Sequence, residues 1–109
     1  SFNFQLNKVL HRLIAEGEHQ QQDFKYEISD ARKIARTLSA FANTDGGRLL
    51  IGVKDNGKIA GVRSDEEIYM VEAAATMYCT PPVACHMSVP REEGHSDRCC
   101  TCLPMLPNL

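Results

Sequence analysis

Residues 41–53, FANTDGGRLLIGV, constrain the fold more than any other stretch, because two hydrophobic periodicities meet there. Over residues 31–42, apolar side chains recur three and four positions apart, which predicts an amphipathic helix. The apolar run Leu49–Val53 lies between glycines and predicts a short buried strand. Only residues 43–47 connect the two, and Gly46 or Gly47 can adopt the positive φ that a sharp exit requires. The sequence therefore predicts a helix that turns abruptly into a strand of the core.

Two further elements are predicted before this stretch. Over residues 4–16 apolar side chains lie on one helical face, and Gly17 follows as a C-terminal stop. Residues 22–28 alternate between apolar and polar, which predicts a half-buried strand whose inward face carries Phe24, Tyr26 and Ile28. Ser29 and Asp30 are both favourable N-cap residues for the helix that follows.

The second half of the chain contains a turn signal and a helix signal. Asn56-Gly57 predicts a tight hairpin turn with positive φ at both central positions, and 59–62 is the expected return strand. Ser64 and Glu67 form the pattern of a capping box before a third helix, which ends before Pro81-Pro82. The inward residues of this helix are expected to be Ile68, Val71, Ala74, Ala75 and Tyr78. Weaker patterns predict strands at ACHMSV and RCCTCLP, with a turn at REEG between them.

These elements predict an α+β (mixed α/β) fold, in which three helices pack on a small mixed or antiparallel sheet. A length of 109 residues favours one domain spanning residues 1–109. Its core is expected over 16–83, and residues 84–109 are expected to form a weak hairpin and a tail. We expect the domain to be the N-terminal part of a longer protein.

Composition excludes several classes of protein. No run approaches the roughly 20 apolar residues of a membrane helix, and the N-terminus lacks the order of a signal peptide. We therefore expect a cytoplasmic protein. Five cysteines, an odd number, argue against a disulfide framework, and their spacing is not that of paired zinc ligands. Residues 1–62 carry a net charge of +2 and residues 63–109 a net charge of −4, which leaves room for a basic patch in the first half.

Three motifs together resemble the Schlafen-type AlbA-like domain family. They are the opening Glu18-xxxx-Asp23-Phe-Lys25, the block FANTDGGRLLIGVKDNGKIAGV over 41–62, and the following helix that ends in a proline pair. The resemblance covers residues 16–83. It implies the fold of that domain and a nucleic-acid (DNA) binding role in a bacterial transcriptional regulator, without enzymatic activity or a cofactor.

The same resemblance implies a second role, because vertebrate Schlafen relatives include endoribonucleases that use three acidic residues. Carried over to this sequence, the first two acids are Glu18 and Asp23, and Asp55 is the best match for the third. These carboxylates would bind a divalent cation, since such ions prefer oxygen ligands. Asp23 stands where the family usually has Glu, and its carboxylate is one methylene shorter.

The family has also been called a divergent ATPase domain, but the sequence argues against Walker-type chemistry. A P-loop requires G-xxxx-G-K-[ST] between a strand and a helix. The paired glycines here follow a helix and precede a strand, and no such motif occurs in the chain.

The candidate phosphate contacts are basic residues and the residues of the central turn. Lys and Arg supply most of the sequence-independent affinity for nucleic acid, and consecutive amides can bind an anion. An equally simple interpretation is a solvated helix face and a plain helix stop. The candidates are Lys25, Arg32, Lys33, Arg36, Asn43, Thr44, Gly46, Gly47, Arg48 and Lys54.

Three hypotheses remain open from the sequence. The first is a nucleic-acid-binding module, and the second is a metal-dependent endoribonuclease, which requires Glu18, Asp23 and Asp55 to converge. The third is a structural or dimerisation domain, for which the apolar face of residues 6–14 would have to be exposed for a second copy. Further domains of a longer protein are expected partners under each hypothesis.

Overall fold

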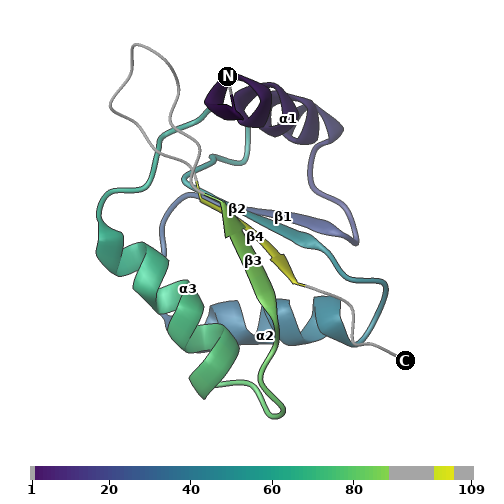
Figure 1. Ribbon diagram of the computed structural model, residues 1–109, viewed down its shortest axis with the longest axis vertical. Helices are drawn as coiled ribbons and strands as arrows, with labels where there is room; N and C mark the ends of the chain where they lie inside the picture. Colours follow the sequence, from purple (N-terminus) through teal and green to yellow (C-terminus); the bar gives the residue numbers. More distant parts are fainter. Residues whose placement is uncertain (1, 89–99, 105–109) are drawn as a thin grey trace.

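The computed structural model describes the backbone of residues 2–88 and 100–104 and the side chains of residues 8–87. The elements are α1 (Phe2–Glu16), β1 (Gln22–Lys25), α2 (Ala31–Ala42), β2 (Arg48–Ile51), α3 (Asp65–Met77), β3 (Cys85–Ser88) and β4 (Cys100–Pro104). The four strands form one sheet in the order β1-β2-β4-β3 (Figure 1). Strands β1 and β2 are parallel, and the other two pairs are antiparallel. The predicted α+β fold with a small mixed sheet and three helices is confirmed.

Strand β2 is buried on both of its faces, as the continuous apolar run predicted. Leu49 and Ile51 belong to the larger core, which is completed by apolar residues of α2 and α3. Leu50, between them, points to the opposite face and joins a smaller core with Phe24 and Val53. All three of these β2 side chains are fully buried, and burying each contributes roughly 1.5–3 kcal/mol to stability. The rest of the fold is arranged around this strand.

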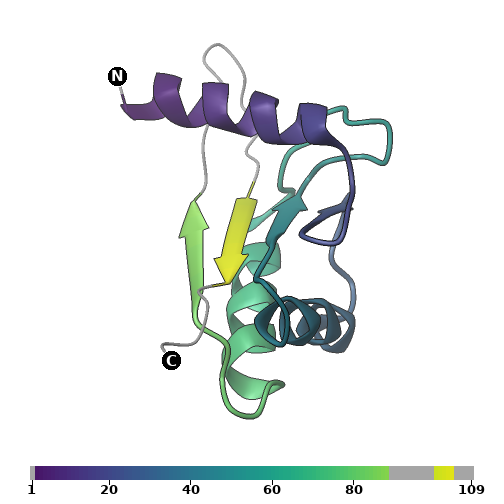
Figure 2. The same cartoon turned by 90° about the vertical axis from the view of Figure 1, so that its right-hand side faces the viewer.

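Helix α1 covers the smaller core and lies across the end of the molecule opposite α2 and α3 (Figures 1 and 2). Leu10 is buried there, Leu13 and Ile14 are half-buried, and Val9 is exposed. The predicted helix is confirmed, and Gly17 follows it with φ 75°. Because residues 10–14 of the apolar face pack on the chain's own core, they offer little surface to a second copy, and a homodimer stays a prediction.

Strand β1 is shorter than predicted, and the prediction for Tyr26 is wrong. The strand ends at Lys25, whose carbonyl accepts hydrogen bonds from the amides of Gly52 and Val53 at the end of β2. Once the strand pairing ends, the alternation of apolar and polar residues no longer determines which way a side chain points, and Tyr26 is exposed. At the other end of β1, the polar residue Gln22 is almost completely buried on the same face as Phe24.

The turn after β2 differs from the prediction in its backbone, and the predicted return strand is absent. Among the described residues positive φ occurs only at glycines, so Asn56 does not have it and Gly57 does, at 85°. The Gly57 amide donates to the Lys54 carbonyl, and the Asn56 side chain accepts from the Lys58 amide. Residues 59–62 are not a strand, because only Ile59 pairs with Val53 in an isolated bridge. Beyond that bridge, the amides of residues 60 and 61 both donate to the carbonyl of residue 52, which ends regular pairing.

Ser64 is the N-cap residue of α3 as predicted, but the predicted hydrogen bonds of a capping box are not formed. The Ser64 side chain makes no capping hydrogen bond. Glu67 turns inward instead, where its two oxygens accept from the backbone N–H of Ile28 at 2.9 Å and of Arg63 at 2.8 Å. Glu67 is only 6% exposed. Through its hydrogen bond to the Ile28 amide it joins α3 to the segment that follows β1.

The remaining part of α3 and the last strands mostly follow the predictions. Val71, Ala74 and Ala75 are buried and Ile68 is half-buried, but Tyr78 lies beyond the helix and is 51% exposed, so its inward placement is wrong. Strands β3 and β4 confirm the two weak strand signals. The predicted turn at REEG and the tail after Pro104 lie outside the described residues.

Replacing Glu67 by Ala tests its role in joining two segments. We expect Glu67→Ala to lower the free energy of unfolding by about 3 kcal/mol, because two backbone N–H groups lose their acceptor. Glu67→Gln keeps one acceptor oxygen and should cost about half as much. Urea denaturation measures both, with the exposed neighbour Glu66→Ala as the matched control. A cost for Glu67→Ala no larger than that of Glu66→Ala would contradict this role.

Candidate functional site

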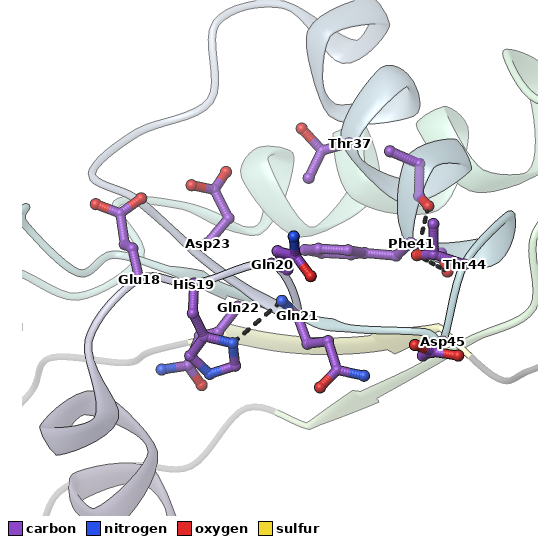
Figure 3. A pocket seen from close by; sticks show the side chains of 11 residues that line it. Glu18, His19, Gln20, Gln21, Gln22, Asp23, Thr37, Phe41, Thr44 and Asp45 are labelled. Atoms are coloured by element: carbon purple, nitrogen blue, oxygen red, sulfur yellow. Dashed lines mark hydrogen bonds between the residues drawn. The ribbon is translucent and has the colours of Figure 1, made fainter.

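An acidic pocket lies between α2 and the segment that connects α1 to β1. Its volume is about 670 Å³, and the described residues of its wall include three carboxylates and no Lys or Arg. Figure 3 shows the side chains of Glu18 and Asp23 close together and pointing in the same direction. The lining residues are Glu18, His19, Gln20, Gln21, Gln22, Asp23, Thr37, Ala40, Phe41, Thr44 and Asp45.

The chain between α1 and β1 brings Glu18 to Asp23 by folding back on itself. The backbone groups of His19 and Gln22 exchange two hydrogen bonds, at 2.9 and 3.0 Å, which close a tight turn. Glu18 precedes this turn and Asp23 follows it, so their side chains meet. The Phe24 amide, at 3.4 Å from Glu18 Oε2, further orients that carboxyl group.

Gln22 fixes this turn to the rest of the fold. Its side-chain amide donates to the carbonyls of Leu13, at 2.6 Å, and Gly17, at 2.8 Å, at the end of α1. Its side-chain oxygen accepts from Arg48 Nε at 3.0 Å. Arg48 in turn reaches Glu16 at 2.8 Å. The predicted phosphate contact Arg48 is thus occupied in joining β2 to α1, and sequence reasoning missed Gln22 because nothing in its local pattern distinguishes it.

The proximity of these acids raises the pKa of Glu18. The largest cause is the hydrogen bond between the Glu18 and Asp23 side chains, followed by burial, and the Phe24 amide opposes the shift. The charge of Asp55 contributes a smaller rise. Glu18 and Asp23 are thus neighbours in the pocket, whereas Asp55 acts on Glu18 through its charge alone and does not line the pocket.

These acids do not form a metal-ligand set in the structure. In the part of the chain that is described, no group of three His, Cys, Asp or Glu side chains could hold a metal ion. Glu18 and Asp23 instead lie side by side, and this proximity raises the pKa of Glu18. We therefore derive no chemical step through a metal at this pair. Cys79 is a buried thiol that donates to the Ala35 carbonyl, and the side chains of Cys99, Cys100 and Cys102 lie outside those described.

Several basic side chains outside α2 have partners in the structure. Lys25 forms an ion pair with Asp23 at 3.3 Å. Lys54 lies 5.4 Å from the ring centre of Tyr26, and Arg63, 5.1 Å from the same ring, is paired with Glu27. Such cation–π contacts hold an exposed tyrosine against the surface. A phosphate that approached Lys25 would therefore also meet the charge of Asp23.

The basic face of α2 differs from these cations. Arg32, Lys33 and Arg36 are exposed, and within the described part of the chain none of them forms an ion pair with a carboxylate. Two of them, Arg32 and Arg36, line a second hollow of about 620 Å³, which we call the basic pocket. Its other lining residues are Ala35, Ser39, Ala40, Asn43, Tyr78, Cys79 and Thr80. Tyr78 was missed as a site residue because the helical pattern directed it inward.

The turn over residues 43–47 is a helix end, as one of the two interpretations predicted. The amides of Asn43, Thr44 and Gly46 all donate to carbonyls in the last turn of α2. Gly46 has φ 85°, and a Cβ on Gly47 would lie 2.4 Å from the Phe41 ring. The two glycines thus serve the exit from the helix and the packing of Phe41. Three amides of this turn, those of Asn43, Thr44 and Gly46, are thus used within the helix end. Of the two polar candidates, the Asn43 side chain lines the basic pocket, whereas the Thr44 hydroxyl donates to the carbonyls of Ala40 and Phe41.

Comparison with known proteins identifies one family. The model of the family described as Schlafen, AlbA_2 matches residues 18–96. The match begins just after α1 and includes every residue that lines the two pockets. No curated protein matches the sequence. Within the described residues, no helix is long and apolar enough to cross a membrane.

Titration of Glu18 tests the contact between the acids. By carboxyl ¹³C NMR we expect its pKa to lie above the ordinary value of 4.5. Asp23→Asn should lower it most, Asp55→Asn less, and Asp45→Asn, a control in the same pocket, should leave it unchanged. Because the folded chain binds the proton more tightly, stability should fall as pH rises from 4.5 through the raised pKa. An unchanged Glu18 titration in Asp23→Asn would show that the two carboxyls do not interact.

Proposed function

Because the chain belongs to the Schlafen AlbA_2 family, we propose that it is a nucleic-acid-binding domain whose phosphate contacts lie on α2. Membership in this family indicates a nucleic-acid-related domain. DNA binding in a bacterial transcriptional regulator, without catalysis, is the specific form of the proposal. It assigns the first contact with nucleic acid to Arg32, Lys33 and Arg36.

The observation that supports the proposal is the lack of carboxylate partners on this face. Cations already paired within a protein gain little from a phosphate, because the new contact replaces an existing one. Lys25, Arg48 and Arg63 are paired in this way. The three cations of α2 project from successive turns of one helix with no acidic partner among the described residues. Releasing condensed counterions from phosphates provides the driving force for such a face.

The acidic pocket gives the proposed interface a direction. The two pockets share Ala40 as a wall, so α2 lies between them. A phosphate backbone is attracted on the side of Arg32 and Arg36 and repelled on the side of Glu18 and Asp23. This opposition favours one placement of the strand on the domain.

Salt dependence tests the proposed interface. For duplex binding we expect each of Lys33→Gln and Arg36→Gln to reduce the slope of log K against log salt by about 0.9. Fluorescence anisotropy at a series of NaCl concentrations measures this slope. Lys58→Gln and Arg12→Gln are exposed controls with the same change in charge. Equal effects of the controls and the α2 variants would indicate a response to net charge only and would refute this interface.

A second candidate function is cleavage of nucleic acid at the acidic pocket. The observation that favours it is the contact of Glu18 and Asp23 in a pocket beside Lys25, together with the raised pKa of Glu18. Paired carboxyls with displaced pKa values occur at catalytic sites that exchange protons. In this role Lys25 would contact the phosphate and Asp55 would act through its charge.

Cleavage of a labelled structured RNA on denaturing gels tests the second candidate. Reactions with Mn²⁺ and with EDTA are needed, because the resemblance associates these acids with a divalent cation. If the pair is catalytic, we expect Glu18→Gln and Asp23→Asn each to reduce the rate by about 10²-fold or more. Asp45→Asn, in the same pocket, should retain activity. If the RNA stays intact in every lane while the wild type still binds it, cleavage is refuted and nucleic-acid binding is the function that remains.

A further inference from the structure

The basic pocket combines two kinds of group that recognise nucleotides. Its guanidinium groups, from Arg32 and Arg36, suit the phosphate, since Arg offers a planar set of donors that matches phosphate oxygens. Its aromatic wall is Tyr78, and other lining residues add amide and hydroxyl groups. None of the described residues that line this pocket is Asp or Glu. The charge and composition of the pocket therefore suit an anion that carries a flat, partly polar group.

The Tyr78 ring is placed to receive such a flat group. It lies beyond the end of α3 and is 51% exposed. The Arg32 guanidinium is 6.0 Å from its ring centre, at the outer limit of a cation–π contact. Nucleobases stack both on tyrosine rings and on guanidinium planes. A base at this position would therefore find a stacking surface on Tyr78 and a neighbouring cation.

We propose that the basic pocket binds one unpaired nucleotide of a single strand, with its base on Tyr78 and its phosphate at Arg32 and Arg36. The inference rests on the proposed function and names the form of nucleic acid that the domain prefers. In a duplex both faces of each base are covered by its neighbours, so a duplex cannot use Tyr78. A volume of about 620 Å³ is within the usual range of small-ligand sites. The single strand consequently gains a contact that the duplex lacks.

The test compares single and double strands on variants of Tyr78. Fluorescence anisotropy measures the affinity of a fluorescein-labelled oligothymidylate and of a duplex of the same length at one salt concentration. Tyr78→Leu should weaken single-strand binding roughly tenfold and leave duplex binding unchanged, while Tyr78→Phe, which keeps the ring, should bind as the wild type does. Tyr69→Leu is the matched control, because Tyr69 is an exposed tyrosine of α3 outside the pocket. Thermal melts confirm that each variant is folded.

The remaining outcomes separate this inference from the proposed function. Lys33 does not line the pocket, so Lys33→Gln should weaken both ligands in any case. Suppose that Lys33→Gln weakens binding of both the oligothymidylate and the duplex. If Tyr78→Leu then changes neither affinity, or lowers both equally, the inference is refuted and the proposed function stands. Full displacement of the oligonucleotide by inorganic phosphate at an equal phosphate concentration would show an anion site without stacking and would also refute it. If neither ligand binds the wild type, both proposals fail.

Discussion

Burial of β2 on both faces is the constraint on which the rest of the structure depends. A strand with Leu49 and Ile51 on one side and Leu50 on the other needs a cover for each side, and a chain of this length has few elements to supply it. Helices α2 and α3 cover one face, and α1 closes the smaller core. Both pockets result from this division. The acidic pocket forms where the chain passes from α1 into β1 beside α2, and the basic pocket forms where α2 meets the segment after α3.

Two buried polar side chains connect these helices and strands by hydrogen bonds. Gln22 connects the end of α1 to β1 and, through Arg48, to β2. Glu67 connects the start of α3 to the segment after β1. Each satisfies backbone or side-chain groups that would otherwise be buried without partners, and such groups are costly to leave unpaired. Since Gln22 stands between Glu18 and Asp23 in the turn, the same side chain that stabilises the fold also positions the two acids.

The range of the interactions decides which features the sequence predicts and which it misses. Helix α2, its cap at Asp30 and the buried run of β2 are encoded by neighbouring residues, and all three were predicted. The directions of Tyr26 and Tyr78 were predicted wrongly, because one lies where strand pairing has ended and the other lies beyond the helix. Glu67 contacts an amide 39 positions away, and no local pattern contains that information.

The candidate site divides in the same way. Its acids could be named from the sequence, because the motif that carries them is local. The contact of Glu18 with Asp23 requires the turn that only the fold reveals, and so does the role of Gln22 in holding that turn. The opposition of the two pockets across α2 likewise depends on how α2 packs, since Ala40 is a wall of both.

This opposition explains why the basic face could serve as the first contact in either proposed function. A strand held by Arg32 and Arg36 would have to cross the helix near Ala40 before its backbone reached Glu18 and Asp23. That passage brings phosphates from a region of positive potential into one of negative potential, which costs free energy unless charge is compensated at the acids. A chain that only binds would keep the strand on the basic side. A chain that cleaves must offset the repulsion, and protonation of Glu18, which its raised pKa favours, is one means of reducing it. Under either proposal, we therefore expect the charge of this pair to limit how far a bound strand extends over α2.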